Sequence, residues 1–171
     1  MPAEALPNDS LPAAPSNWKR LAIIATLVVF SAFEIWVGWT STIPDSVDRS
    51  TLHGFLIVAH IIGQMLLGSM ALLCALFGRA RYAIILLAAN IVLGWLTADL
   101  FDPGNWRITS LWSAQETIVN LVLMPIAGLV AGSFAARNIR LGWATLLVCL
   151  PTLYVIVVMV GFTIIILTHG F

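Results

Sequence analysis

Residues 52–77 read LHGFLIVAHIIGQMLLGSMALLCALF, a run of 26 residues that contains no aspartate, glutamate, lysine or arginine. An α-helix needs about 20 mostly apolar residues to cross the roughly 30 Å hydrocarbon layer of a bilayer. The run is long enough for this, and it lacks the alternation of apolar and polar residues that is typical of a barrel strand. It therefore predicts a membrane-spanning helix.

Four further apolar stretches of similar length flank this run. The chain is 60% hydrophobic and 9% charged, whereas a soluble domain carries about a quarter charged residues. We therefore expect an all-α integral membrane protein in which residues 21–171 form one transmembrane helical bundle. Residues 1–20 contain four of the eight prolines and predict a disordered tail. The five predicted helices are at about 21–39, 52–77, 82–100, 113–134 and 141–167.

The basic residues predict the orientation of these helices. If five helices alternate in direction, Arg49 and Arg107 fall on one side of the membrane. Cytoplasmic loops of membrane proteins carry an excess of lysine and arginine. We therefore expect a cytoplasmic amino terminus, an external carboxyl terminus and a location in the bacterial inner membrane. The six basic residues on the predicted cytoplasmic side are Lys19, Arg20, Arg79, Arg81, Arg137 and Arg140.

Strongly polar side chains occur inside the predicted helices. Charged groups are costly in lipid and normally face a bundle interior or a water-filled cavity. At 100° per residue, His53, His60 and Gln64 share one helix face. Asp99 instead falls away from the face of Asn90. The predicted intramembrane polar cluster, part of which converges in the outer half of the bundle, is Glu34, His53, His60, Gln64, Asn90, Asp99, Glu116 and Asn120.

Small residues continue several of these polar faces. Because small side chains let helix backbones approach closely, they predict the packing surfaces of a membrane bundle. The last helix has only a weak polar stripe, which consists of Thr145, Cys149, Thr152 and Thr163. The glycines predicted to lie at helix contacts are Gly68, Gly94, Gly128 and Gly132.

The polar cluster admits three interpretations. Its members can be structural residues that hydrogen-bond across helices, which is common in membrane bundles. Alternatively, His60 with Glu34 or Glu116 can exchange protons or ions. These three residues are also possible metal ligands, but His53 and His60 are two helical turns apart, about 10 Å, which is too far to chelate one ion. We expect neither a metal nor another cofactor.

Three function classes follow. The first is an accessory or structural subunit of a membrane complex, which the absence of any family-identifying motif favours. The second is a small transporter or proton- or ion-conducting protein that uses Glu34, His60 and Glu116. The third is a membrane metal-binding protein or enzyme that faces outside, although no nucleophile or phosphate-binding motif indicates an enzyme. The expected partners are lipid and other membrane subunits or a second copy, not nucleic acid, because the basic residues are scattered.

Overall fold

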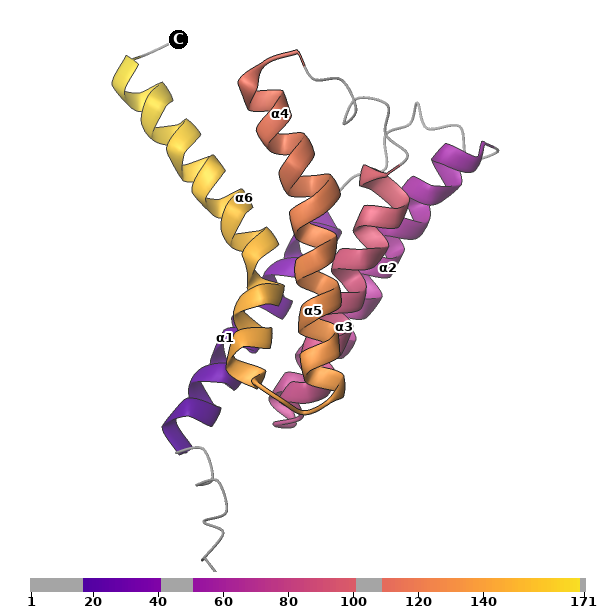
Figure 1. Ribbon diagram of the computed structural model, residues 1–171, viewed down its shortest axis with the longest axis vertical. Coiled ribbons are helices and arrows are strands. Elements are labelled where there is room, and N and C mark those ends of the chain that lie inside the picture. The colour runs from indigo at the N-terminus through magenta and orange to yellow at the C-terminus, as the bar shows by residue number, and fades with distance from the viewer. Residues whose placement is uncertain (1–16, 41–50, 101–108, 170–171) are drawn as a thin grey trace, which may run out of the picture.

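The computed structural model describes residues 17–40, 51–100 and 109–169, and within these ranges the chain is helical throughout, apart from short turns. Figure 1 shows the helices running up and down between two ends of one bundle. The elements are α1 (Asn17–Thr40), α2 (Leu52–Leu76), α3 (Ala80–Gly94), η1 (Trp95–Asp99), α4 (Leu111–Ile118), η3 (Val119–Leu123), α5 (Met124–Ala136) and α6 (Leu141–His169).

Five helical rods in the described chain are long and apolar enough to cross a membrane, which agrees with the number that the sequence predicts. We call these rods the five candidate spans. Residues 17–20 belong to the first turns of α1 rather than to the predicted tail. Lysine and arginine are good helix formers, so the helix extends beyond the apolar run. Residues 1–16 of the predicted tail lie outside the described residues.

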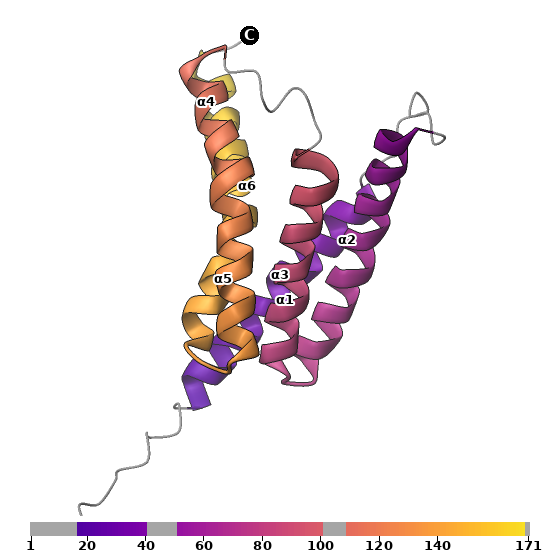
Figure 2. The ribbon, with the colours of Figure 1, turned by 45° about the vertical axis from the view of Figure 1, so that its right-hand side comes forward.

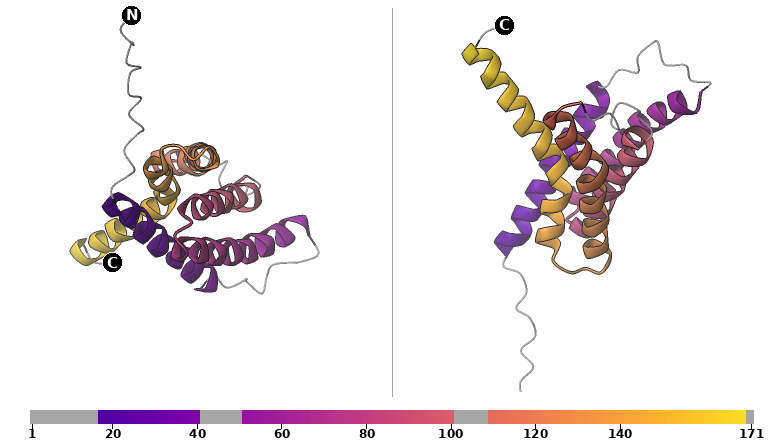
Figure 3. Two further views of the ribbon diagram at one scale, coloured as in Figure 1. Left: turned by 90° about the horizontal axis from the view of Figure 1, so that it is seen from below. Right: turned by 45° about the horizontal axis from the view of Figure 1, so that its top comes forward.

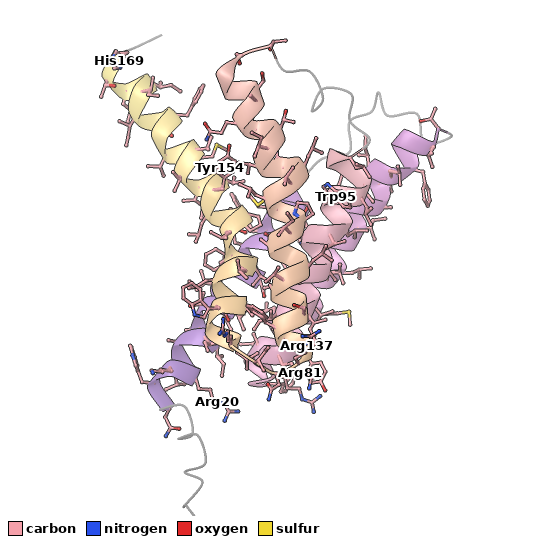
Figure 4. All side chains as sticks on the ribbon, in the orientation of Figure 1. Arg20, Arg81, Trp95, Arg137, Tyr154 and His169 are labelled. Carbon is pink, nitrogen blue, oxygen red and sulfur yellow. The ribbon has the colours of Figure 1, made fainter. Side chains whose placement is uncertain are left out.

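One end of the bundle carries every lysine and arginine of the described ranges. It is formed by the start of α1 and by the turns that join α2 to α3 and α5 to α6. Figure 4 shows Arg20, Arg81 and Arg137 at this end and His169 at the opposite end. We call it the basic end. The alternating direction of the helices gathers these residues, which are widely separated in the sequence.

The tightest packing lies toward the basic end. Many of the fully buried side chains there are alanines, which allow helix backbones to approach closely. Toward the opposite end the helices diverge (Figures 1 and 2). Seen from below, α3 lies between α2 and the rod formed by α4, η3 and α5 (Figure 3). The alanines without exposed surface are Ala71, Ala75, Ala83, Ala131, Ala135 and Ala144.

The four glycines predicted to lie at helix contacts do lie at such contacts. A Cβ atom at Gly128 would be 3.2 Å from Cγ2 of Ile91 and 3.3 Å from the carbonyl oxygen of Ala88, both in α3. Cβ atoms at the other three would lie against α1, against His60 and against Ala88. The absence of side chains at these positions therefore sets how closely the helices pack. These three glycines are Gly68, Gly94 and Gly132.

Two candidate spans widen into π-helical turns, and these turns, η1 and η3, contact each other. Pro125 accounts for η3. It has no backbone N–H, and in a regular α-helix its ring would clash with the carbonyl group of Leu121. A wider turn immediately before the proline relieves that clash, and such turns frequently occur at functional sites.

The second half of α6 separates from the bundle. The buried residues of α6 end at Thr152, and most side chains beyond it are exposed and apolar. Pro151 immediately precedes this point. Because proline cannot donate the backbone hydrogen bond of the helix, it is a usual cause of kinks. Figure 1 shows the upper part of α6 leaning away from α4.

We predict that Gly128→Val destabilises the protein by about 1–3 kcal/mol, the usual cost of overpacking. The added side chain would meet Ile91 and the backbone of Ala88 in α3. Thermal unfolding in detergent micelles, followed by helical circular dichroism, measures the change. Gly161→Val is the matched control, because a Cβ atom at Gly161 would meet nothing within 4 Å. Equal destabilisation by both substitutions would contradict the proposed packing role of Gly128.

Candidate functional site

The carboxyl group of Glu34 connects four of the five candidate spans. Its Oε2 atom accepts hydrogen bonds from Nε2 of Gln64 at 2.9 Å and from Nδ2 of Asn90 at 3.1 Å. Its Oε1 atom accepts a hydrogen bond from Oγ1 of Thr152 at 2.9 Å. These residues belong to α1, α2, α3 and α6, so a single side chain joins helices that are distant in the sequence. We call the four residues the Glu34 network.

The packing of α1 on α2 positions this carboxyl group. A Cβ atom at Gly68 would lie 3.4 Å from Cβ of Glu34, and one at Gly38 would lie 2.7 Å from Cγ of Met65. Neither glycine has such an atom, and α1 and α2 therefore approach closely. Gln64 lies one turn before Gly68 on α2, which brings its amide group within reach of Glu34.

His60 lies one turn further along the same face of α2. A Cβ atom at Gly94 would be 3.1 Å from Cε1 of its imidazole ring, so this glycine makes room for the ring between α2 and α3. The ring also lies within electrostatic range of the Glu34 carboxyl group. Its Nδ1 atom is buried and has no hydrogen-bond partner among the described residues.

The Glu34 network lies on the wall of a pocket of about 470 Å³. All five candidate spans contribute side chains to this pocket, and α6 contributes the largest share of its apolar wall. Figure 4 shows Tyr154 on the side of α6 that faces the rest of the bundle. The polar residues that line the pocket are Glu34, His60, Gln64, Asn90, Glu116, Asn120, Thr152 and Tyr154.

Six of the eight residues predicted from the sequence thus line one pocket. Glu116 is exposed and its side chain makes no hydrogen bond to the described residues, whereas Asn120 lies within the widened turn η3. The side chains of His53 and Asp99 lie outside the described part of the chain. The structure therefore brings together six members of the cluster, which come from α1, α2, α3, α4 and η3.

Sequence reasoning missed two polar residues of the pocket, Thr152 and Tyr154. The signal for Thr152 was present, because Thr145, Cys149 and Thr152 form a stripe at helical spacing and all three are buried. Nothing in the sequence indicated that this stripe faces Glu34, which precedes Thr152 by 118 residues. For Tyr154 the sequence offers no signal that separates it from the apolar residues around it.

The pocket is acidic. Its lining contains the carboxyl groups of Glu34 and Glu116 and no lysine or arginine. No ion pair forms among the described residues, so the charge of neither carboxylate is neutralised by a basic side chain within those ranges. The amide and hydroxyl groups of the Glu34 network donate hydrogen bonds that orient its carboxyl group, but they carry no positive charge that would neutralise it.

Three buried polar atoms of residues that line the pocket have no hydrogen-bond partner among the described residues. They are Nδ1 of His60, Oδ1 of Asn90 and the hydroxyl oxygen of Tyr154. A buried polar group without a partner costs about 1–3 kcal/mol, and such groups in native proteins usually bind water or a ligand. Because these three atoms are themselves buried, a ligand in the pocket could reach them only if the lining side chains rearrange.

The metal-site interpretation gains no support from the described residues. Among them, no three histidine, cysteine, aspartate or glutamate side chains form a group that could hold a metal ion. His60, Glu34 and Glu116 share the pocket but do not form such a group.

The sequence matches no protein-family model, and neither the curated proteins nor the solved structures show a significant similarity to it.

We predict that Thr152→Val destabilises the protein by about 1–3 kcal/mol, because it removes one of the three donors to the carboxyl group of Glu34 with little change in shape. Thr163→Val is the matched control on the same helix, since the Thr163 hydroxyl is exposed and bonds only to the carbonyl group of Met159. Chemical unfolding in detergent micelles measures both. Equal stabilities of the two variants would show that the Glu34 network does not hold α6 in place.

Proposed function

We propose that the chain is a small integral membrane transport protein that binds a cation in the pocket around Glu34. The observation that carries this proposal is the pair of carboxyl groups, Glu34 and Glu116, on a pocket without lysine or arginine. Ionisable residues inside membrane spans are rare and usually mark a substrate, ion or proton pathway. An acidic lining favours cations over anions.

The size and lining of the pocket favour a small organic cation over a bare metal ion. Its volume of about 470 Å³ falls within the range typical of small-molecule sites. The aromatic rings of Phe33 and Tyr154 also line it. Aromatic faces attract cations, most strongly where water is excluded. A protonated amine would therefore find carboxylates and aromatic rings in one cavity.

The position of the pocket within the bundle indicates the side of the membrane to which it would open. The alanine-rich core fills the bundle toward the basic end, whereas the helices diverge on the side where the pocket lies. With the basic end in the cytoplasm, the pocket belongs to the outer half of the membrane. This is the arrangement of a transporter that has closed on its cytoplasmic side, and His60 can exchange a proton beside the bound cation.

We predict that a reporter fused after Phe171 lies outside the cytoplasm. Alkaline phosphatase, which folds only outside the cytoplasm, should be active at this position, and green fluorescent protein should be dark. A fusion after Arg140, at the basic end, is the control and should give the opposite pair of results. The reversed pattern would refute the orientation and with it an outward-facing pocket.

We predict that Glu34→Gln lowers cation uptake about thirtyfold or more, because a bound cation then loses its buried counter-charge. Purified protein in liposomes would be assayed with methylammonium, tetramethylammonium, sodium ions and a proton gradient. Val158→Trp should also abolish uptake, since Val158 lines the pocket and the larger side chain fills it while the Glu34 network is retained.

Val157→Trp is the control for Val158→Trp. Val157 is the preceding residue on α6, is 68% exposed and does not line the pocket. Its substitution should leave uptake unchanged. If liposomes that contain the native protein take up none of the four probes, the proposal of cation transport through this pocket is wrong. Equal uptake by the two tryptophan variants would also contradict it.

An accessory subunit of a membrane complex is the second candidate function. The second half of α6 favours it, because this apolar segment leans away from the bundle and contacts little of it. Purification from native membranes in mild detergent distinguishes the candidates. A partner chain in fixed stoichiometry, with no uptake by the isolated protein, would favour the subunit.

A further inference from the structure

A second hollow lies at the basic end, far from the Glu34 pocket. It is a groove of about 850 Å³ between the start of α1, the turn from α2 to α3 and the turn from α5 to α6. Gly78, at φ +69°, forms part of its wall. A Cβ atom at Gly78 would lie 3.8 Å from Nη2 of Arg20, so the guanidinium group of α1 reaches across to the α2–α3 turn.

Four cationic side chains border this groove, namely Lys19, Arg20, Arg79 and Arg81. The guanidinium group of Arg81 already has one partner within the protein, because its Nη2 atom donates a hydrogen bond to the carbonyl oxygen of Ala136 at 2.7 Å. The other three make no hydrogen bond or ion pair with their side chains among the described residues, and the groove lining contains no carboxylate. Four like charges around one hollow favour an anion.

Apart from Asn138, the remainder of the groove is mostly apolar. Trp18, Ile23, Tyr82 and Leu141 line it, and Trp18 and Tyr82 are largely exposed. Tryptophan and tyrosine are enriched where membrane helices meet the headgroup layer. A soluble anion would use only the cationic side chains, whereas a lipid would use the cationic side chains through its phosphate and the apolar wall through its acyl chains.

We propose that this groove is a binding site for the headgroup and proximal acyl chain of one anionic phospholipid. Basic pockets between transmembrane helices on the cytoplasmic side bind anionic headgroups in this way. The inference rests on the membrane placement given under the proposed function, but not on the cation pocket.

Native mass spectrometry of the full-length protein in detergent tests this inference. The protein is titrated with phosphatidylglycerol, with phosphatidylcholine of the same acyl chains, and with inorganic phosphate. We expect one phosphatidylglycerol to bind with clear preference. The double variant Arg20→Gln/Arg79→Gln should weaken that binding about thirtyfold, since each basic residue near an anionic surface contributes roughly a fivefold gain in affinity.

The double variant Arg137→Gln/Arg140→Asn is the matched control. It removes the same charge from the same end of the bundle, but neither residue lines the groove, and asparagine tolerates the positive φ of 46° at position 140. It should bind phosphatidylglycerol as the native protein does. If both double variants weaken binding equally, the attraction is diffuse and the groove is not a site.

A variant that keeps every charge gives an independent test. Gly142 lines the groove, and a Cβ atom there would meet nothing within 4 Å, so Gly142→Trp adds bulk to the groove without a clash. It should reduce lipid binding. Unchanged binding to Gly142→Trp, equal binding of the two lipids, or full competition by inorganic phosphate would overturn the inference. Cation uptake that persists in these cases would leave the proposed function intact.

Discussion

The architecture of this bundle depends on one acidic side chain that is satisfied by three neutral donors. Glu34 of α1 receives its hydrogen bonds from α2, α3 and α6, and these bonds join residues separated by 30, 56 and 118 positions in the chain. A partly buried carboxyl group is costly without hydrogen-bond partners, so the helices that supply its donors are constrained to surround it. The register and rotation of four helices are therefore coupled at one point.

Close helix packing toward the basic end also holds the helices around Glu34 in place. The alanine core and the contact glycines let the helices approach closely there. Glu34 lies where the helices begin to separate, since Pro151 precedes its partner Thr152 and is followed by the diverging half of α6. The same geometry that holds the carboxyl group thus leaves a cavity beside it.

The pocket around Glu34 and the groove at the basic end have opposite electrostatic character. The pocket in the diverging half is lined by carboxyl groups without basic side chains, and the groove at the basic end is lined by basic side chains without carboxyl groups. Charges of one sign gathered around a cavity repel each other and favour a ligand of the opposite sign. This separation is the physical basis for proposing a cation site at one level and an anionic lipid site at another.

The sequence by itself determined the number of long apolar helices and their approximate limits, and it picked out the strongly polar residues within them. Long apolar runs and the cost of burying polar groups in hydrocarbon are local properties, and for that reason Glu34, His60 and Asn90 can be recognised without a structure. The glycines at the helix contacts can be recognised in the same way, because backbone approach requires small residues.

Only the tertiary structure decided which of these residues meet. A helical stripe gives the direction of a face relative to its own helix, but not the neighbour that it faces, so the bond from Thr152 to Glu34 could not be read from the sequence. Three further features likewise depend on how the helices cross. They are the widened turn before Pro125, the separation of the second half of α6 from the bundle, and the groove lined by Arg20. These features arise from contacts between distant segments, which local periodicity does not encode.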